Sequence, residues 1–378
     1  MTGAMAPPRS ALPEQTLLLA GGGHAHVAVL ADWIRRGAPA GVRTVLLTPH
    51  ARLRYSGMVP GWLAGQHAAD DGLVDCAALA ARAGAEWVEG RLSAIDPAAN
   101  TATTDNGATI AFDVASLDTG GVGRARDVLG DDPRIIDIRP IEGFVERIAA
   151  MPALRRVVVA GGGAGGVELA FGLRNRGGAQ PPPAVVLVTG AGGVLPGFGA
   201  RVRALVAAEL ARQGIAVVAG DARIEGGRIM ARAAALEPAD VIIAALGSAP
   251  PSWLAESGLA LDAAGFVAVD AQHRSCSHPQ IFAAGDIAAR TDRPLAHSGV
   301  HAVMAGPVLA ANLREALAGE PPSASYRPRR HNLYLINTGD GRAIASYGPF
   351  AAQGRWVLNW KHRIDRRWIA GYAALAGS

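Results

Sequence analysis

Residues 17–33 read LLLAGGGHAHVAVLADW: an apolar run, three glycines and a second apolar run. This order is typical of a strand, a tight turn and a helix that cradle a dinucleotide, with Gly21 and Gly23 allowing the turn and the close approach of a pyrophosphate. His26 replaces the third glycine of the G-x-G-x-x-G pattern. Because that glycine serves helix–strand packing, we expect His26 to shift the helix outward and to leave phosphate contact intact. The alternative is that His24 and His26 are solvated loop residues.

A second glycine loop lies in the stretch RRVVVAGGGAGGVELAFGL. Gly161, Gly163 and Gly166 keep the full spacing, after an expected strand over 157–160 and before a helix expected from Val167 onward. Two such units, 140 positions apart, predict two bound dinucleotides in one chain. For the second unit, a purely structural glycine turn is the alternative.

A third motif is HPQIFAAGDIAA, residues 278–289. In it Gly285 lets the chain turn, and Asp286 presents a carboxylate at a helix start. The stretches 112–121 (FDVASLDTGG) and 240–251 (DVIIAALGSAPP) are predicted as apolar strands that end at glycines, where the chain crosses between two nested nucleotide domains.

These motifs predict an α/β protein with two Rossmann-like nucleotide-binding domains, the second inserted in a discontinuous first. We expect the first domain over 14–120 and 248–325, the second over 121–247, and a short C-terminal segment over 326–378.

Composition narrows the classes further. The chain has 378 residues, of which 50% are hydrophobic and 18% charged, so disordered and fibrous classes are excluded. We expect no membrane-spanning helix and, behind a loose leader at 1–13, no secretory signal, which predicts a cytoplasmic protein. Cys76 and Cys276 stand 200 positions apart outside any C-x-x-C or C-x4-C motif, so we expect neither a disulfide framework nor a bound metal.

The motifs GGGHAH, GGGAGGVE and IFAAGDIA resemble the flavoproteins with two dinucleotide-binding domains, which include pyridine nucleotide-disulfide oxidoreductases and type II NADH dehydrogenases. The stretches RYSGMVPGWLAG (54–65) and 337–368 are similar to a bacterial subgroup that is sometimes fused to selenide, water dikinase. The resemblance implies FAD in the first domain, NAD(P)H in the second, and hydride transfer between them. The absence of a cysteine pair beside the expected flavin position makes a dithiol reductase improbable.

The resemblance also implies roles for particular residues. Asp286 would bind the ribityl or phosphate part of FAD, and Glu168 would face the nicotinamide side, unless it is a solvated acid in the first turn of its helix. Thr48 and Thr189 stand where the class often has an acid for the ribose, so the choice between NADH and NADPH stays open. The full set of expected cofactor-binding residues is Gly21, Gly22, Gly23, His24, His26, Thr48, Gly161, Gly163, Gly166, Gly247, Gly285 and Asp286.

A helix is predicted within 296–317, with Ser298 as its N-cap and its N-terminus aimed at the flavin. His297 and His301 would then lie near the flavin edge, where either could donate a proton to a reduced quinone or to the flavin. Packing or solvation, and a two-histidine metal site, are the alternatives for this pair.

The C-terminal segment carries Trp356, Trp360, Ile364 and Trp368 at four-residue intervals. Lys361, Arg363, Arg366 and Arg367 lie between them, and residues 351–378 hold five basic residues against Asp365. This pattern indicates a helix at a membrane interface, on the inner face of the cell membrane, and a quinone acceptor. The alternative is that the stripe packs as core and that the arginines are solvated.

The sequence therefore predicts an FAD-dependent NAD(P)H oxidoreductase that reduces an acceptor, most naturally a quinone. A sulfide:quinone oxidoreductase is a second reading, if folding brings Cys76 and Cys276 together. A flavin sensor or assembly module without turnover is the third. A homodimer is compatible with the sequence, and nucleic-acid binding is not expected, because the basic residues cluster in one short tail.

Overall fold

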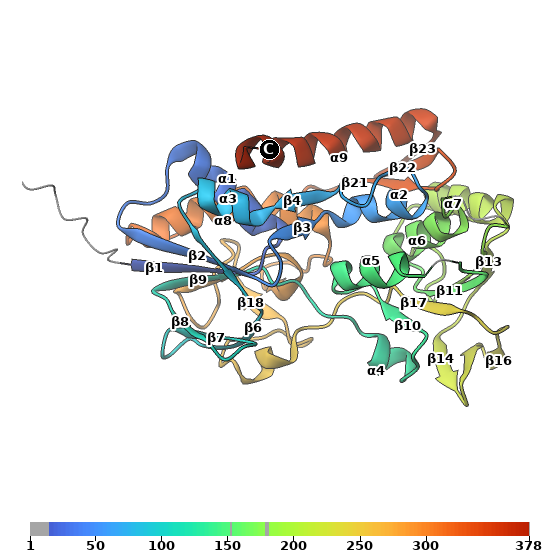
Figure 1. Cartoon of the computed structure of the whole chain (residues 1–378), viewed down its shortest axis with the longest axis horizontal. Helices are drawn as coiled ribbons and strands as arrows, with labels where there is room; N and C mark the ends of the chain where they lie inside the picture. The colour runs from blue at the N-terminus through green and yellow to red at the C-terminus, as the bar shows by residue number, and fades with distance from the viewer. Residues whose placement is uncertain (1–14, 152, 178–180, 378) are drawn as a thin grey trace, which may run out of the picture.

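The computed structural model describes residues 15–151, 153–177 and 181–377. The leader predicted over 1–13 lies outside the described residues. Two α/β bodies stand side by side, and the C-terminal helix runs along one face of both (Figure 1).

The first body is built on a parallel five-stranded sheet of order β19-β9-β1-β2-β5. Its strands are β1 (Gln15–Ala20), β2 (Val42–Thr48), β5 (Glu86–Glu89), β9 (Val114–Leu117) and β19 (Ile281–Ala283). Strands from distant parts of the chain thus share one sheet. Helices α1 (His24–Arg36) and α8 (Gly299–Leu317) pack on each other through Gly306, where a Cβ would lie 2.5 Å from that of Ala28.

The second body has a parallel sheet of order β10-β17-β11-β12-β13. Its strands are β10 (Ile135–Asp137), β11 (Arg156–Ala160), β12 (Ala184–Val188), β13 (Ala216–Val218) and β17 (Val241–Ala244), with helices α6 (Ala164–Arg174) and α7 (Ala200–Arg212). Helix α6 begins at Ala164, directly after its N-cap Gly163 and three residues before the predicted start at Val167.

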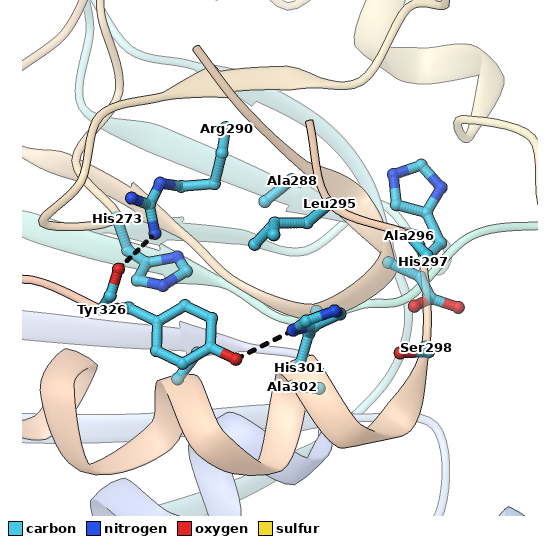
Figure 2. Close-up of a pocket in the computed structure, with 13 residues that line it drawn as sticks. His273, Ala288, Arg290, Leu295, Ala296, His297, Ser298, His301, Ala302 and Tyr326 are labelled. Carbon is cyan, nitrogen blue, oxygen red and sulfur yellow. Dashed lines mark hydrogen bonds between the residues drawn. The ribbon is translucent and has the colours of Figure 1, made fainter. Parts of the chain in front are cut away.

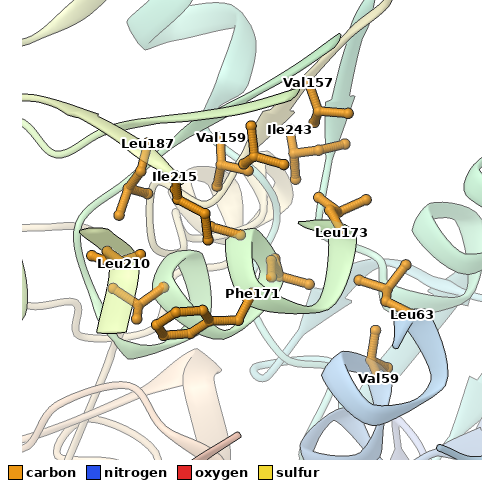
Figure 3. Packing of buried hydrophobic residues seen from close by; sticks show 14 of the residues in the cluster. Val59, Leu63, Val157, Val159, Phe171, Leu173, Leu187, Leu210, Ile215 and Ile243 are labelled. Atoms are coloured by element: carbon orange, nitrogen blue, oxygen red, sulfur yellow. The ribbon is translucent and has the colours of Figure 1, made fainter. Parts of the chain in front are cut away.

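One apolar core joins the two bodies. Helix α2 (Val59–Leu63) belongs to the N-terminal part of the chain, yet its Val59 and Leu63 pack in the cluster around Phe171 and Leu173 of α6 (Figure 3). Gly172 allows this contact, since a Cβ there would lie 2.7 Å from the Pro60 carbonyl oxygen. The segment that precedes α2 is therefore fixed against the second nucleotide unit.

Smaller elements complete the two bodies. The short strands are β3 (Arg52–Arg54), β4 (Leu73–Asp75), β6 (Leu92–Asp96), β7 (Thr101–Thr104), β8 (Thr109–Ala111), β14 (Ala222–Glu225), β15 (Arg228–Ala231), β16 (Ala234–Ala235), β18 (Val267–Val269) and β20 (Ala288–Arg290). The short helices are α3 (Cys76–Arg82), α4 (Ala125–Leu129), α5 (Ile141–Ala149) and the 3₁₀ turns η1 (Ser56–Met58), η2 (Ser252–Glu256) and η3 (Gly285–Ile287).

The C-terminal segment is an antiparallel meander of β21 (Leu333–Asn337), β22 (Ala343–Tyr347) and β23 (Phe350–Gly354), followed by α9 (Arg355–Ala376). Helix α9 packs on α1, α3 and β4 of the first body and on the meander (Figure 1). None of the helices in the described ranges is long and apolar enough to cross a membrane. The residue limits given above for the domains remain predictions.

Candidate functional site

The first glycine loop joins β1 to α1. Gly21 has φ 99°, and a Cβ there would lie 2.3 Å from the carbonyl oxygen of Asp118, so only glycine fits. Helix α1 begins at His24, directly after Gly23, so its N-terminus faces the crevice at the carboxyl end of the sheet.

His26 is fully buried, so its interpretation as a solvated loop residue is wrong. Its Nδ1 lies 2.6 Å from the carbonyl oxygen of Gly21 and donates to it, and its Nε2, 2.8 Å from the Ser116 hydroxyl, accepts. Burial lowers the pKa of His26 to about 4, so the ring is neutral near pH 7. Two hydrogen bonds thus take the place of the packed third glycine.

The second loop keeps the glycine arrangement. A Cβ at Gly161 would lie 2.1 Å from the Ala245 carbonyl oxygen, and one at Gly166 would lie 2.0 Å from the Gly161 carbonyl oxygen. At Gly163 and Gly247, in contrast, a Cβ would meet nothing within 4 Å. The loop is therefore closed where the helix meets the strand and open where a phosphate would approach.

Asp286 lies in η3, at the end of the first sheet, after the turn at Gly285 (φ 69°). Its carboxylate pairs with Arg139 at 2.6 Å. Arg139, which no sequence motif indicated, comes from the segment between β10 and α5 in the second body. The ion pair therefore links the two nucleotide units across the crevice.

Thr48 ends β2, as predicted, but its hydroxyl is engaged within the protein. It donates to the His50 carbonyl oxygen at 2.6 Å and accepts from Trp87 Nε1 at 3.0 Å. Thr189 likewise donates to the Gly190 carbonyl oxygen at 3.2 Å. Neither position supplies an acid for a ribose.

His297 and His301 line one cavity of about 20 Å³ at the start of α8. They have different partners: His301 Nδ1 lies 2.8 Å from the Tyr326 hydroxyl (Figure 2), whereas the His297 ring packs on Phe266 with centroids 4.1 Å apart. Burial lowers the pKa of His301. Ser298 is the N-cap residue, but its hydroxyl makes no capping bond. Among the described residues, no three His, Cys, Asp or Glu side chains form a metal site.

Glu168 is not a solvated acid. Its Oε1 accepts from the Asn337 amide at 2.8 Å, on β21 of the C-terminal segment. Burial raises the pKa of its carboxyl, and Lys361 of α9 opposes that shift. Glu168 therefore faces the C-terminal segment, a relationship that the α6 sequence alone did not indicate.

Helix α9 buries a charged pair, Lys361 and Asp365, on the side that faces Glu168. Lys361 is only 8% exposed; its Nζ pairs with Asp365 Oδ2 at 3.1 Å and donates to the Gly57 carbonyl oxygen at 3.0 Å. The Tyr55 hydroxyl donates to Asp365 Oδ1 at 3.3 Å. The expectation that Lys361 belongs to an exposed basic flank is therefore wrong.

The four residues predicted to form one apolar stripe on α9 do not share one environment. Trp356, Trp360 and Ile364 are 57%, 41% and 40% exposed. Trp368 instead packs inside, with its ring centroid 4.7 Å from that of Tyr55 and 5.2 Å from that of His24. The exposure of Trp356, Trp360 and Ile364 is compatible with the predicted membrane-interface helix. The prediction that Trp368 lies on the same face is wrong, since it packs against Tyr55 and His24.

The two cysteines are free thiols in unlike surroundings. Cys76 is buried at the start of α3, and burial raises its pKa to about 12. Cys276 is exposed beside Thr291. Neither has the features of a flavin-linked dithiol.

The crevice suits a polar cofactor. Three buried polar atoms, His24 Nε2, Arg139 Nε and Ser298 Oγ, have no hydrogen-bond partner among the described residues. All three lie around Asp286: Arg139 pairs with it, Ser298 lines the same cavity, and His24 interacts with its charge. Buried polar atoms without protein partners fit a bound group that supplies them.

The sequence pattern of the pyridine nucleotide-disulphide oxidoreductases matches residues 16–306. The chain belongs to this family. Members of the family bind FAD and use NAD(P)H, and these are the cofactors of the chain.

The similarity of the chain to individual proteins is modest. The chain is 29% identical over 266 residues to the biphenyl dioxygenase system ferredoxin–NAD(+) reductase component of Paraburkholderia xenovorans, covering 66% of this chain and 63% of that relative's length. Two solved structures have a similar fold. The sulfide:quinone oxidoreductase from Aquifex aeolicus has a TM-score of 0.75 and 18% identity, over 96% of this chain and 92% of that one. The water-forming NADH oxidase from Lactobacillus brevis has a TM-score of 0.73 and 21% identity, over 89% of this chain and 75% of that one. At these identities the likeness concerns the fold.

Proposed function

We propose that the chain is an NAD(P)H dehydrogenase that holds FAD at the first glycine loop and NAD(P)H at the second, and that passes electrons to a quinone. When bound, FAD accepts a hydride and returns electrons to the acceptor. Gly21, Gly23 and Asp286 would hold FAD, and the open backbone at Gly163 and Gly247 would receive the second nucleotide.

The division of α9 into an aromatic outer face and a charged inner face carries the quinone assignment. Trp356, Trp360 and Ile364 present apolar side chains to the outside, as in helices that lie in the headgroup layer. The inner face places Lys361 and Asp365 against Tyr55, close to the first glycine loop. A membrane-dissolved acceptor would reach the crevice from this side.

Reduction of a quinone consumes two protons, and two side chains of the chain are candidates to exchange them. Burial raises the pKa of Glu168, which favours the protonated carboxyl group, the form that can donate a proton. His301 lies in the cavity at the start of α8, hydrogen-bonded to Tyr326, and is a second group that can exchange a proton.

The sulfide reading has weaker support. A sulfide oxidoreductase needs reactive thiols beside the flavin, and the buried Cys76 thiol stays protonated because its pKa is raised to about 12.

The test is anaerobic mixing of the holoprotein with NADH and, separately, NADPH, while the visible band of oxidised flavin is recorded. A short-chain quinone is then added. Bleaching by one nucleotide followed by quinone-driven recovery is the expected result. Bleaching that only a ferredoxin reverses would overturn the quinone assignment. A flavin that sulfide bleaches but neither nucleotide does would overturn the dehydrogenase in favour of the sulfide alternative, and a flavin that none of these bleaches would overturn both.

A further inference from the structure

Asp118 follows β9, and its carboxyl group lies at the N-terminus of α1. Its Oδ2 accepts from the amides of Ala25 at 2.8 Å and His26 at 3.2 Å. A Cβ at Gly23 would lie 2.2 Å from the Asp118 Cγ, and one at Gly285 would lie 2.4 Å from its Oδ1. The carboxyl group therefore occupies the gap between the first glycine loop and the turn that carries Asp286.

The carboxyl group of Asp118 has no counterpart in the second nucleotide unit. Ala245 is the counterpart of Asp118: their amides donate to Ala160 and Ala20, respectively, each at 2.8 Å. At Ala245 the side chain is a methyl group, and the space in front of Gly163 is open. Only the first loop puts an acid where a dinucleotide's phosphates approach the helix.

The surroundings of Asp118 favour its neutral form. Burial raises its pKa to about 7, although the amides of His26 and Ala25 work against this, and the charge of Asp286 adds to the rise. The other titratable groups around it are His24 and His26 on α1, both neutral at pH 7 because burial lowers their pKa values to about 4. The positive charge of Arg139 is directed to Asp286.

A pyrophosphate brought to this helix terminus would add negative charge within hydrogen-bonding distance of the carboxyl group. Two like charges in a buried site repel strongly, and the carboxylate relieves the repulsion by taking up a proton. A protonated carboxyl group then has one O–H to donate, and phosphate oxygens are strong acceptors.

We propose that Asp118 is a further cofactor-binding residue, which donates its carboxyl O–H to a pyrophosphate oxygen of FAD, so that FAD binding takes up one proton from solution. The proton adds to a carboxylate oxygen of Asp118, and no other bond changes. This inference rests on the proposed placement of FAD at the first loop. It adds that the affinity for FAD depends on pH through one named side chain.

The test follows the release of FAD from diluted holoprotein by the fluorescence of the free flavin, between about pH 6 and pH 9. Above about pH 7 the affinity of the wild-type protein should fall up to tenfold for each pH unit, because the free protein must then be protonated to bind. D118N, which keeps the acceptor oxygen for the helix amides and an N–H donor toward the phosphate, should bind FAD with an affinity that does not change over this range.

The matched control is D113N. Asp113 precedes the same strand at its opposite end, is exposed, and accepts from the Thr16 amide at 2.6 Å. This variant should keep the wild-type pH dependence. NADH binding at the second loop, where Ala245 replaces the acid, is an internal control and should not show the same fall.

If D118N does not fold, calorimetry of FAD binding to the wild-type protein in two buffers of different ionisation enthalpy measures the proton uptake directly. Close to one proton at pH 8 supports the inference, and none overturns it. An affinity that is independent of pH in the wild-type protein, or one that is lost when EDTA removes divalent cations, overturns it while leaving the dehydrogenase proposal intact. A chain that binds no FAD at any pH overturns both.

Discussion

The imidazole Nε2 of His26 and the hydroxyl of Ser116 lie 2.8 Å apart inside the interface between α1 and β9. In the second nucleotide unit Gly166 stands at the position of His26 in the glycine loop. Ile243 stands at the position of Ser116, because each is the next-to-last residue paired with the central strand of its sheet. The first loop thus replaces an apolar contact by a buried hydrogen bond. Such a bond matters most when one partner is removed and the other stays buried without a partner.

The pair can be tested by a double-mutant cycle. H26A leaves the Ser116 hydroxyl buried and opens a cavity, so we expect a loss of roughly 2–4 kcal/mol in the free energy of unfolding. S116A alone should cost about 1 kcal/mol, and H26A/S116A should be more stable than the sum by about 1 kcal/mol. Urea unfolding of the four proteins measures the coupling, and strict additivity would contradict a direct bond.

Histidines whose pKa values are lowered in the folded state make the fold sensitive to acid. Burial lowers the pKa values of His24, His26 and His273 to about 4, while unfolded imidazoles titrate near 6.5. As the pH falls through 6.5, the unfolded state binds protons first, so stability declines by about 1 kcal/mol for each ring by about pH 5.5. Asp118, with its raised pKa, acts in the opposite direction but is a single group.

H273Q measures one of these contributions. His273 Nδ1 lies 3.1 Å from the Ala283 carbonyl oxygen, and the glutamine amide can donate in its place. The stability of this variant should fall less steeply between pH 7 and pH 5.5 than that of the wild-type protein, by about 1 kcal/mol over this range. Equal slopes in urea unfolding at the two pH values would show that His273 is not the group that titrates.

The sequence predicted the sheets well because each central strand is a continuous apolar run followed by glycine. It missed Arg139 and Tyr326, which reach the site from segments without any motif. Asp118 did leave a signal: DTGG after the strand in the first unit stands against ALGS in the second. Only the internal comparison makes that charge conspicuous, because an aspartate before a turn is otherwise ordinary.

The stripe on α9 was misjudged for a geometric reason. A four-residue step advances about 400° around a helix, so each member is rotated by about 40° from the one before. Over the three steps from Trp356 to Trp368 the drift reaches about 120°, which carries Trp368 from the outer face to the inner one. The exposed and buried parts of this helix accordingly have separate tests.

The buried ion pair of α9 is the first of these. K361M leaves Asp365 buried beside Tyr55 without its counter-charge, and we expect a loss of about 3–5 kcal/mol in the free energy of unfolding at pH 7. K361M/D365N removes the stranded charge and keeps an acceptor for the Tyr55 hydroxyl, so it should recover most of that loss. A double variant as unstable as K361M would mean that the bond from Lys361 to Gly57, rather than the ion pair, is what matters.

The exposed face of α9 should bind lipid. W356A/W360A removes two solvent-exposed indoles, so its thermal stability should match that of the wild-type protein. Its binding to anionic vesicles, measured by co-sedimentation, should fall roughly tenfold or more. V128A, an exposed apolar truncation on α4, is the control that should leave vesicle binding unchanged. Equal binding of both variants would contradict a membrane face on α9.

A variant of Glu168 should affect one half-reaction and not the other. E168Q keeps an oxygen for the Asn337 amide but cannot exchange a proton, so flavin reduction by NAD(P)H should be unaffected while reoxidation by quinone slows by roughly 100-fold. Because burial raises the pKa of Glu168, the wild-type reoxidation rate should decline as the pH rises through that pKa and the acid form is lost, and E168Q should show no such decline. E146Q, on the exposed side of α5, is the matched control and should keep the wild-type rates. Stopped-flow traces of each half-reaction decide the matter: equal slowing of reduction and reoxidation would place Glu168 in nucleotide binding instead of proton delivery to the acceptor.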